Sequence, residues 1–212
     1  MHIIDKIRDL IRDIARHIAA YINKLSGGKI SPNSVTLSGL ALHLPIAALI
    51  VSGHNFWAAI GLLVFGMFDT FDGELARLQN RTSSAGMFLD SVSDRLKEII
   101  LYLSMLWVLA NSGNKTNLII IAATMAISIC ITYANAWGEV VLSKAGIKNK
   151  QTNKLLRTGI ASYDIRMFLI FLGLLTNHML WAIYVIFVLG SWTLGVRILN
   201  VFSILDKGST DV

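Results

Sequence analysis

Four aspartates recur at fixed offsets within one short stretch of an otherwise apolar chain. The first two lie three residues apart and the last two lie four apart, so each pair falls on one face of its helix. Carboxylates next to apolar segments of membrane length are costly to keep in lipid, which favours a functional site. These aspartates are Asp69, Asp72, Asp90 and Asp94.

Two facing helices would bring these four carboxylates together. Four carboxylates at close range stay ionised only if a cation neutralises them. Hard oxygen ligands select Mg²⁺, Mn²⁺ or Ca²⁺ over Zn²⁺, which prefers histidine and cysteine. The sequence therefore predicts one or two divalent ions at this position, an arrangement suited to phosphoryl chemistry.

The residues between the aspartates are suited to binding a phosphorylated ligand. Gly73 and Gly86 have no side chain, so a bulky ligand such as a nucleotide can approach the backbone there. Arg77 offers a planar fork that matches a diphosphate. Three further charges lie on other faces of the helix that contains Asp90 and Asp94. We expect them at the membrane interface or paired with one another: Arg95, Lys97 and Glu98.

The composition predicts an all-α integral membrane protein with one transmembrane domain. Of the 212 residues, 54% are hydrophobic and only 15% are charged, whereas a soluble chain carries about 25% charged residues. Several apolar segments approach the length that spans about 30 Å of hydrocarbon. Six transmembrane helices are predicted, with the boundary between the last two near Asn177, over residues 35–52, 56–71, 88–110, 117–142, 166–177 and 179–203.

The segment before the first span has a different pattern. Apolar residues recur at helical spacing through residues 2–25, and charged residues fill the opposite face. This pattern predicts an N-terminal amphipathic helix in the membrane interface, or alternatively a helix packed on a soluble partner. Ser31 and Pro32 predict an N-cap and first helical residue for the span that follows. The expected organisation is an arm at 1–30, a six-helix domain at 31–205 and a cytoplasmic tail at 206–212.

The basic residues indicate the orientation in the membrane. On the six-helix arrangement, lysine and arginine gather on one side, and only Lys115 falls on the other. The positive-inside rule then places both termini and the aspartates on the cytoplasmic side of a multi-pass protein of the cell membrane. The net charge of +6 is interpreted as topology and contact with anionic lipid, and no nucleic-acid partner is expected.

The aspartate stretch also resembles a family signature. It runs Asp69-x2-Asp72-Gly73-x2-Ala76-Arg77-x8-Gly86-x3-Asp90-x3-Asp94, and each fixed position is filled without insertion. This string resembles the signature of the CDP-alcohol phosphotransferases (CDP-alcohol phosphatidyltransferases), integral membrane enzymes of phospholipid synthesis, of the prokaryotic type.

The resemblance implies a reaction and a set of roles. Members transfer a phosphoryl-linked group from a CDP-alcohol, such as CDP-diacylglycerol, to the hydroxyl of a small polar acceptor and release CMP. It implies that the first three aspartates bind two Mg²⁺ ions, with Mn²⁺ as an alternative, and that Asp94 binds one ion and acts as general base. It also implies a homodimer, and contacts to the CDP-linked lipid donor from Gly73, Arg77, Ser83 and the segment Asn33 to Thr36.

The acceptor is less defined by these residues. A phosphorylated acceptor such as inositol phosphate or glycerol phosphate would suit Arg157, Arg166 and Arg197, the last of which lies either at the interface or in a polar cavity. Members that use inositol phosphate tend to carry a basic residue where Asn135 and Trp137 stand here. A polyol phosphate is favoured, and an amino alcohol or serine remains the alternative.

Two other readings of the aspartates stay open. Buried carboxylates at helix ends also suit a divalent-cation transporter, although that function explains neither the glycines nor Arg77 at their offsets. A transporter would further be expected to show a repeated half and a site near the bilayer midplane. A catalytically inactive relative with a scaffold role is the other alternative, but all four aspartates are present.

Overall fold

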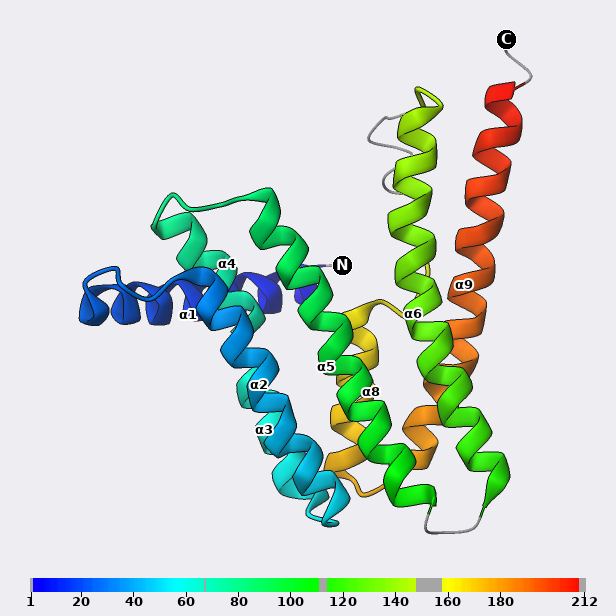
Figure 1. Cartoon of the computed structure of the whole chain (residues 1–212), viewed down its shortest axis with the longest axis horizontal. Helices are drawn as coiled ribbons and strands as arrows, with labels where there is room; N and C mark the ends of the chain where they lie inside the picture. Colours follow the sequence, from blue (N-terminus) through cyan, green and yellow to red (C-terminus); the bar gives the residue numbers. More distant parts are fainter. Residues whose placement is uncertain (1, 67, 111–113, 148–157, 210–212) are drawn as a thin grey trace. The chain divides into compact units, whose positions relative to one another are not determined.

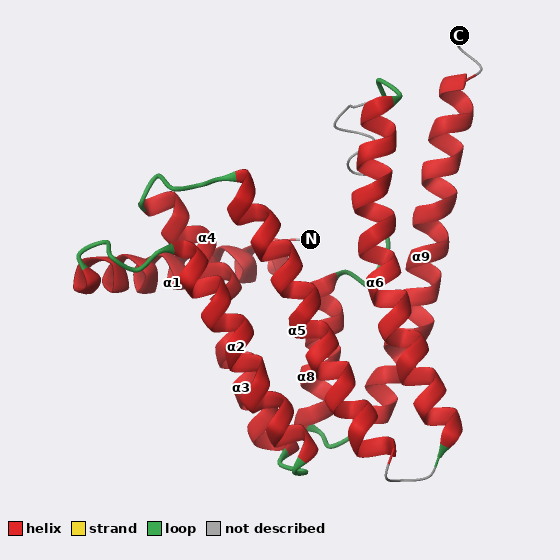
Figure 2. Ribbon diagram, in the orientation of Figure 1, coloured by secondary structure: helices red, strands yellow, loops and turns green. Residues whose placement is uncertain are grey.

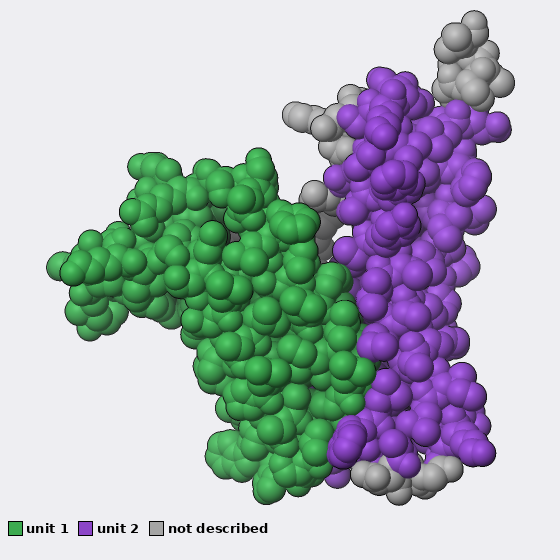
Figure 3. All heavy atoms as spheres, viewed as in Figure 1, with its two compact units in different colours: residues 1–104 green, residues 105–212 purple. Residues whose placement is uncertain are grey.

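The computed structural model describes residues 2–66, 68–110, 114–147 and 158–209, with the side chains of residues 2–12, 69 and 207–209 outside this description. The described residues form helices joined by loops, and they contain no strand (Figure 2). This confirms the all-α prediction. The chain divides into two compact units, residues 1–104 and 105–212 (Figure 3).

The first unit contains the aspartate stretch. Its helices are α1 (His2–Ser26), α2 (Pro32–Val51), α3 (Asn55–Gly66), α4 (Phe68–Leu78) and most of α5 (Ser84–Ala110). α2 packs against α3 and α4, and α1 packs against α4 and runs crosswise to α2 (Figure 1). Ala15 and Ala19 on α1 are buried, and such small residues let two helices approach closely.

The predicted start of α2 is confirmed. Ser31 has extended backbone angles, and its Oγ accepts a hydrogen bond from the Ser34 amide at 3.1 Å. Pro32 follows as the first helical residue, where its missing amide hydrogen leaves no bond unmade. This cap fixes the first turn of α2, which faces the aspartate stretch.

Both ends of the short loop between α4 and α5 are capped. Asn80 adopts a left-handed backbone angle, φ 52°, and the Arg81 amide bonds to the Ala76 carbonyl at 2.9 Å. Asparagine tolerates this conformation, which ends α4. Ser83 then caps α5, since its Oγ accepts from the Gly86 amide at 3.0 Å.

The second unit consists of the end of α5, residues 105–110, followed by α6 (Lys115–Lys144), α8 (Tyr163–Leu175) and α9 (Met179–Ser209). α9 packs along α6 and against α8 (Figure 1). Asn177 has φ 57°, and the His178 amide bonds back to the Gly173 carbonyl at 2.8 Å. The predicted boundary near Asn177 is therefore confirmed.

Four stretches of the described residues are long and apolar enough to cross a membrane: Pro32–Val51, Asn55–Leu78, Lys115–Lys144 and Met179–Asp206. The other two predicted spans differ for physical reasons. α5 carries five charged residues between Asp90 and Glu98, and α8 has only 13 residues, about 20 Å of helix. Six spans, and the interfacial position of α1, stay predictions.

Candidate active site

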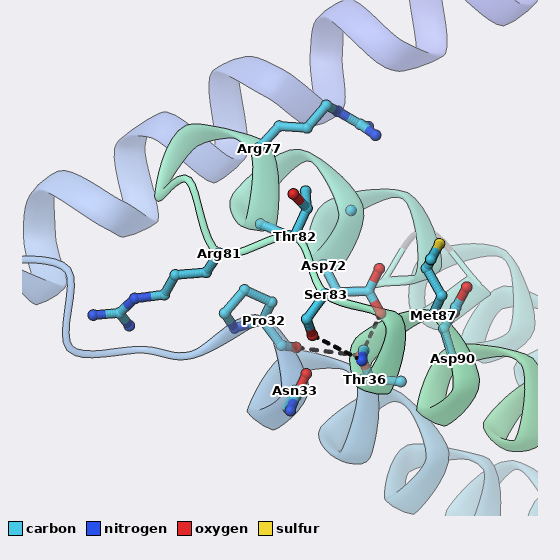
Figure 4. Close-up of a pocket in the computed structure, with 13 residues that line it drawn as sticks. Pro32, Asn33, Thr36, Asp72, Arg77, Arg81, Thr82, Ser83, Met87 and Asp90 are labelled. Atoms are coloured by element: carbon cyan, nitrogen blue, oxygen red, sulfur yellow. Dashed lines mark hydrogen bonds between the residues drawn. The ribbon is translucent and has the colours of Figure 1, made fainter.

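A pocket of about 280 Å³ lies in the first unit, where α2, α4 and the start of α5 meet (Figure 4). It gathers most of the residues predicted from the sequence to bind the donor. In Figure 4 Asp72 and Asp90 lie toward one side of this pocket and Arg81 toward the other. Its lining residues are Pro32, Asn33, Thr36, Asp72, Gly73, Ala76, Arg77, Arg81, Thr82, Ser83, Gly86, Met87 and Asp90.

Asp72 is held in place from a different helix. Its side chain is buried, and its Oδ2 accepts a hydrogen bond from the Thr36 hydroxyl at 2.5 Å. The Thr36 hydroxyl also lies 3.2 Å from the Pro32 carbonyl in the first turn of α2. The capped start of α2 therefore orients one of the predicted metal ligands.

The two glycines of the signature leave room in the pocket wall. A methyl group added at Gly86 would lie 3.3 Å from Ser83 Oγ and 3.6 Å from Asn33 Oδ1. At Gly73 it would lie 3.6 Å from the Arg77 guanidinium. Both glycines therefore line the pocket without a side chain, and their predicted role in ligand approach stays a prediction.

Arg77 lies at the rim of the pocket with its side chain 59% exposed. Its guanidinium donates to Glu74 Oε1 at 2.6 Å and to Oε2 at 3.4 Å. Glu74 is itself buried, and its Oε2 lies 3.8 Å from Arg16 Nε on α1. The predicted diphosphate-binding arginine is therefore attached to a carboxylate that the sequence did not single out.

Asp90 and Asp94 follow each other by one turn on α5, and Asp90 lines the pocket. Asp94 does not line it; its Oδ1 lies 3.4 Å from Lys97 Nζ, and its Oδ2 lies 4.0 Å from Arg95. Arg95 also bonds to Glu98 at 2.9 Å. The predicted pairing is thus seen between Arg95 and Glu98, and the side chains of Lys97 and Glu98 are enclosed in the protein, at 0% and 2% exposed.

The carboxylate oxygens at this pocket are the type of ligand that a hard divalent cation prefers. Asp72 and Asp90 come from two helices and line one pocket, and Asp94 lies one turn beyond Asp90. Among the described side chains no group of three His, Cys, Asp or Glu residues is close enough to hold an ion. The side chain of Asp69, the fourth predicted ligand, lies outside the described residues. The oxygen donors present fit Mg²⁺ or Mn²⁺ chemically.

The predicted acceptor residues belong to the second unit. Arg166 is buried and donates to the Ala161 carbonyl at 2.7 Å. Arg197 is 8% exposed and donates to the carbonyls of Thr158 and Ile131, both at 3.1 Å. Of its two predicted positions, at an interface or inside the protein, these contacts agree with the second, since Arg197 is enclosed in the unit. Arg157 lies outside the described residues.

Sequence reasoning missed several pocket residues. Arg81 was considered only as one of the basic residues that indicate the orientation in the membrane, yet it lines the pocket together with Thr82. A basic residue in the loop directly after the signature was the available signal. Met87 lines the pocket too, and no feature of its type or spacing distinguishes it from an ordinary packing residue.

The chain was compared with known proteins. The family model for CDP-alcohol phosphatidyltransferase matches residues 29–195. A phosphatidylinositol phosphate synthase of Corynebacterium glutamicum is 32% identical over 114 residues, 52% of this chain and 52% of that protein. The match thus spans about half the length of such curated relatives. An archaetidylinositol phosphate synthase of Pyrococcus horikoshii is 27% identical over 84% of this chain and 87% of its own length.

Solved structures show the same fold. Phosphatidylinositol phosphate synthase of Mycobacterium tuberculosis with CDP-DAG bound matches with a TM-score of 0.76 and 20% identity, over 90% of this chain and 94% of that one. The same enzyme in complex with manganese and citrate matches with a TM-score of 0.76. Since the family model covers most of the chain, and six of the eight fixed positions of the signature line one pocket, this protein belongs to the CDP-alcohol phosphatidyltransferase family.

Proposed function

We propose that this protein transfers a phosphatidyl-type group from a CDP-alcohol, such as CDP-diacylglycerol, to the hydroxyl of a small polar acceptor and releases CMP. The observation that carries the proposal is the pocket of the first unit. It combines two carboxylates of the signature, both signature glycines and Arg77 in about 280 Å³. Family membership supports the same reaction class.

The donor would bind along this pocket. Arg77, at the rim, has the planar fork that matches a diphosphate. Asn33 and Ser83, which face each other across Gly86, offer polar contacts to the nucleotide. Gly73 and Gly86 let the ligand approach the backbone. The Arg81 side chain adds a second positive charge to the same wall.

The chemical step would proceed as an in-line displacement. The acceptor oxygen forms a bond to the phosphorus that carries the lipid alcohol, and the bond from that phosphorus to the oxygen of CMP breaks. Asp94 takes the proton of the attacking hydroxyl as general base. Asp69, Asp72, Asp90 and Asp94 would hold divalent ions, which offset the charge that develops on the phosphates.

For the acceptor we propose inositol phosphate ahead of glycerol phosphate. The C. glutamicum and P. horikoshii relatives are inositol phosphate enzymes by name, which supports this choice. Arg157, Arg166 and Arg197 are the proposed acceptor contacts. Asn135 and Trp137, which stand where a basic residue is expected, keep serine or an amino alcohol as the alternative.

The remaining proposals concern the whole protein. It would lie in the cell membrane with six spans, with α1 in the interface and with both termini and the pocket on the cytoplasmic side. A homodimer is proposed from the family resemblance. The first, second and fourth of these spans would be α2, the α3–α4 stretch and α6, which are long and apolar enough to cross.

The test is transfer by the purified full chain in detergent, with CDP-diacylglycerol and Mg²⁺. Labelled inositol phosphate, glycerol phosphate, serine, inositol and choline phosphate are supplied in turn, and CMP release is measured. We expect metal-dependent release with inositol phosphate. Asp94→Asn should lower kcat by about a hundredfold or more, because a general base contributes that much.

Exchange of the donor lipid is the matched control. A CDP-lipid with ether-linked chains is tried alongside the one with ester-linked chains, since both lipids carry the same CDP head group with its diphosphate. Release of CMP with serine alone would overturn the proposed acceptor and keep the reaction class. No CMP with any donor and acceptor pair, or full activity in Asp94→Asn, would contradict the proposed reaction.

A further inference from the structure

Glu74 is a buried carboxylate that neither the family signature nor the proposed reaction uses. It follows Gly73 on α4 and is 4% exposed, although most glutamates of folded proteins lie at the surface. It also lies one turn from Arg77, at the rim of a pocket that would receive an anionic diphosphate. A negative charge there opposes the binding of an anion unless it serves to position nearby arginine side chains.

The contacts of Glu74 show such an arrangement. Arg77 bonds to both carboxylate oxygens, at 2.6 and 3.4 Å, and Arg16 approaches Oε2 at 3.8 Å. The two arginine side chains are 59% and 62% exposed, whereas the Glu74 side chain is 5% exposed. The buried carboxylate thus accepts hydrogen bonds from one exposed arginine, Arg77, and lies within ion-pair distance of a second, Arg16.

The hydrogen bonds to Glu74 determine where the Arg77 guanidinium lies. The group lies near Gly73, because an added methyl there would be 3.6 Å from Nη2 and 3.8 Å from Nη1. Free arginine side chains sample many rotamers, and a preorganised fork loses less freedom on binding a phosphate. Two arginines beside one carboxylate leave this group of three side chains with one net positive charge.

We propose that Glu74 is a positioning residue of the donor site. It holds the Arg77 guanidinium over Gly73, ready for the diphosphate of the donor, and through Arg16 it attaches α1 to the same site. This inference rests on the proposed function, since it concerns the binding of the CDP-linked donor. It also explains a buried acid in α4 that helix packing alone does not require.

The test is Glu74→Gln, which keeps the size of the side chain and removes its charge. We expect the KM for CDP-diacylglycerol to rise about tenfold while kcat stays within about twofold, because ground-state donor binding is what is lost. Affinity for CDP, measured by titration calorimetry without any acceptor, should fall by the same factor. Asp13→Asn removes an exposed acid of α1 and should change neither value.

A double-mutant cycle separates positioning from a general structural role. In an Arg77→Ala background, Glu74→Gln should have no further effect on donor KM or CDP affinity. Should Glu74→Gln fail to fold, Arg16→Gln replaces it in the cycle. That variant should raise donor KM about twofold in the native chain and not at all with Arg77→Ala, since an exposed ion pair is weaker.

The outcomes are distinct. Unchanged donor KM and CDP affinity in Glu74→Gln, or an effect that persists fully without Arg77, would overturn the proposed role of Glu74. A native chain that binds CDP without transferring would overturn the proposed function only, and the CDP titrations would still decide the role of Glu74. A native chain that neither binds CDP nor transfers overturns both.

Discussion

At the scale of residues, the site depends on short contacts that orient charged groups before any ligand arrives. Asp72 is fixed by the Thr36 hydroxyl at 2.5 Å, and Arg77 by Glu74 at 2.6 Å. Hydrogen bonds to ionised groups contribute about 1.5–3 kcal/mol each, more than neutral ones. Asp94 likewise lies near a fully buried lysine, Lys97, at 3.4 Å.

The Thr36 contact gives a prediction about activity. Thr36→Val keeps the shape of the side chain but removes the donor to a buried carboxylate. We expect kcat/KM to fall roughly tenfold or more, because a bond to a charged group of about 2 kcal/mol is lost. Thr36→Ser, which keeps the hydroxyl, should retain most activity in the same CMP-release assay. Equal activity of the valine and serine variants would show that the hydroxyl does not orient Asp72.

At the scale of elements, helix ends and packed loops set where these residues lie. Asn80, in a left-handed conformation, ends α4. α1 packs on α4, and the side-chain oxygen of Asn23 on α1 accepts a hydrogen bond from the side-chain amide of Gln79 at 2.8 Å. In the second unit, α9 holds the segment before α8. Thr193 accepts from the Ala161 amide at 3.0 Å, and Asn200 donates to Thr158 at 2.7 Å.

The position of Thr193 beside this segment predicts a stability effect at Gly159. Its φ of 116° is rare for other residues, and a methyl group there would overlap the Thr193 side chain. Gly159→Ala should lower the free energy of unfolding by about 2 kcal/mol or more, measured by thermal unfolding in detergent. Gly146→Ala is the control, since φ is 73° with nothing within 4 Å, and should lose only about 1 kcal/mol. Equal losses would mean that packing on α9 contributes nothing.

At the scale of the whole molecule, apolar length and the distribution of charge determine how the chain meets a membrane. Four stretches of the described residues are long and apolar enough to cross. Lysine and arginine gather at one end of the predicted spans, and Lys115 alone falls at the other. The positive-inside rule converts this asymmetry into an orientation.

Labelling with a membrane-impermeant maleimide tests that orientation. In a Cys130→Ala background, which removes the single cysteine, a cysteine is introduced as Lys115→Cys or Lys29→Cys; both lysines are exposed. In intact cells we expect labelling of Lys115→Cys, whereas Lys29→Cys should react only after permeabilisation. The parent without cysteine controls for background. The reverse pattern would contradict a cytoplasmic active site.

The sequence by itself determined the features that depend on near neighbours. The spacing of the aspartates, the Ser31–Pro32 start of α2 and the break near Asn177 follow from helical periodicity and capping. These interactions join residues within about one turn, so the local sequence contains them. The family signature likewise named six residues that line the pocket, since its fixed offsets belong to one short segment: Asp72, Gly73, Ala76, Arg77, Gly86 and Asp90.

Only the tertiary structure decided which distant residues meet. Thr36 and Asp72 are 36 positions apart, and Arg16 reaches Glu74 from another helix. Likewise Arg197 donates to the carbonyl of Ile131, 66 positions away, rather than extending to an interface. Residue type and periodicity do not encode such partners, because the choice depends on how separate helices pack. The same packing buries Lys97, whose sequence position alone did not distinguish a charge at the membrane interface from a paired one.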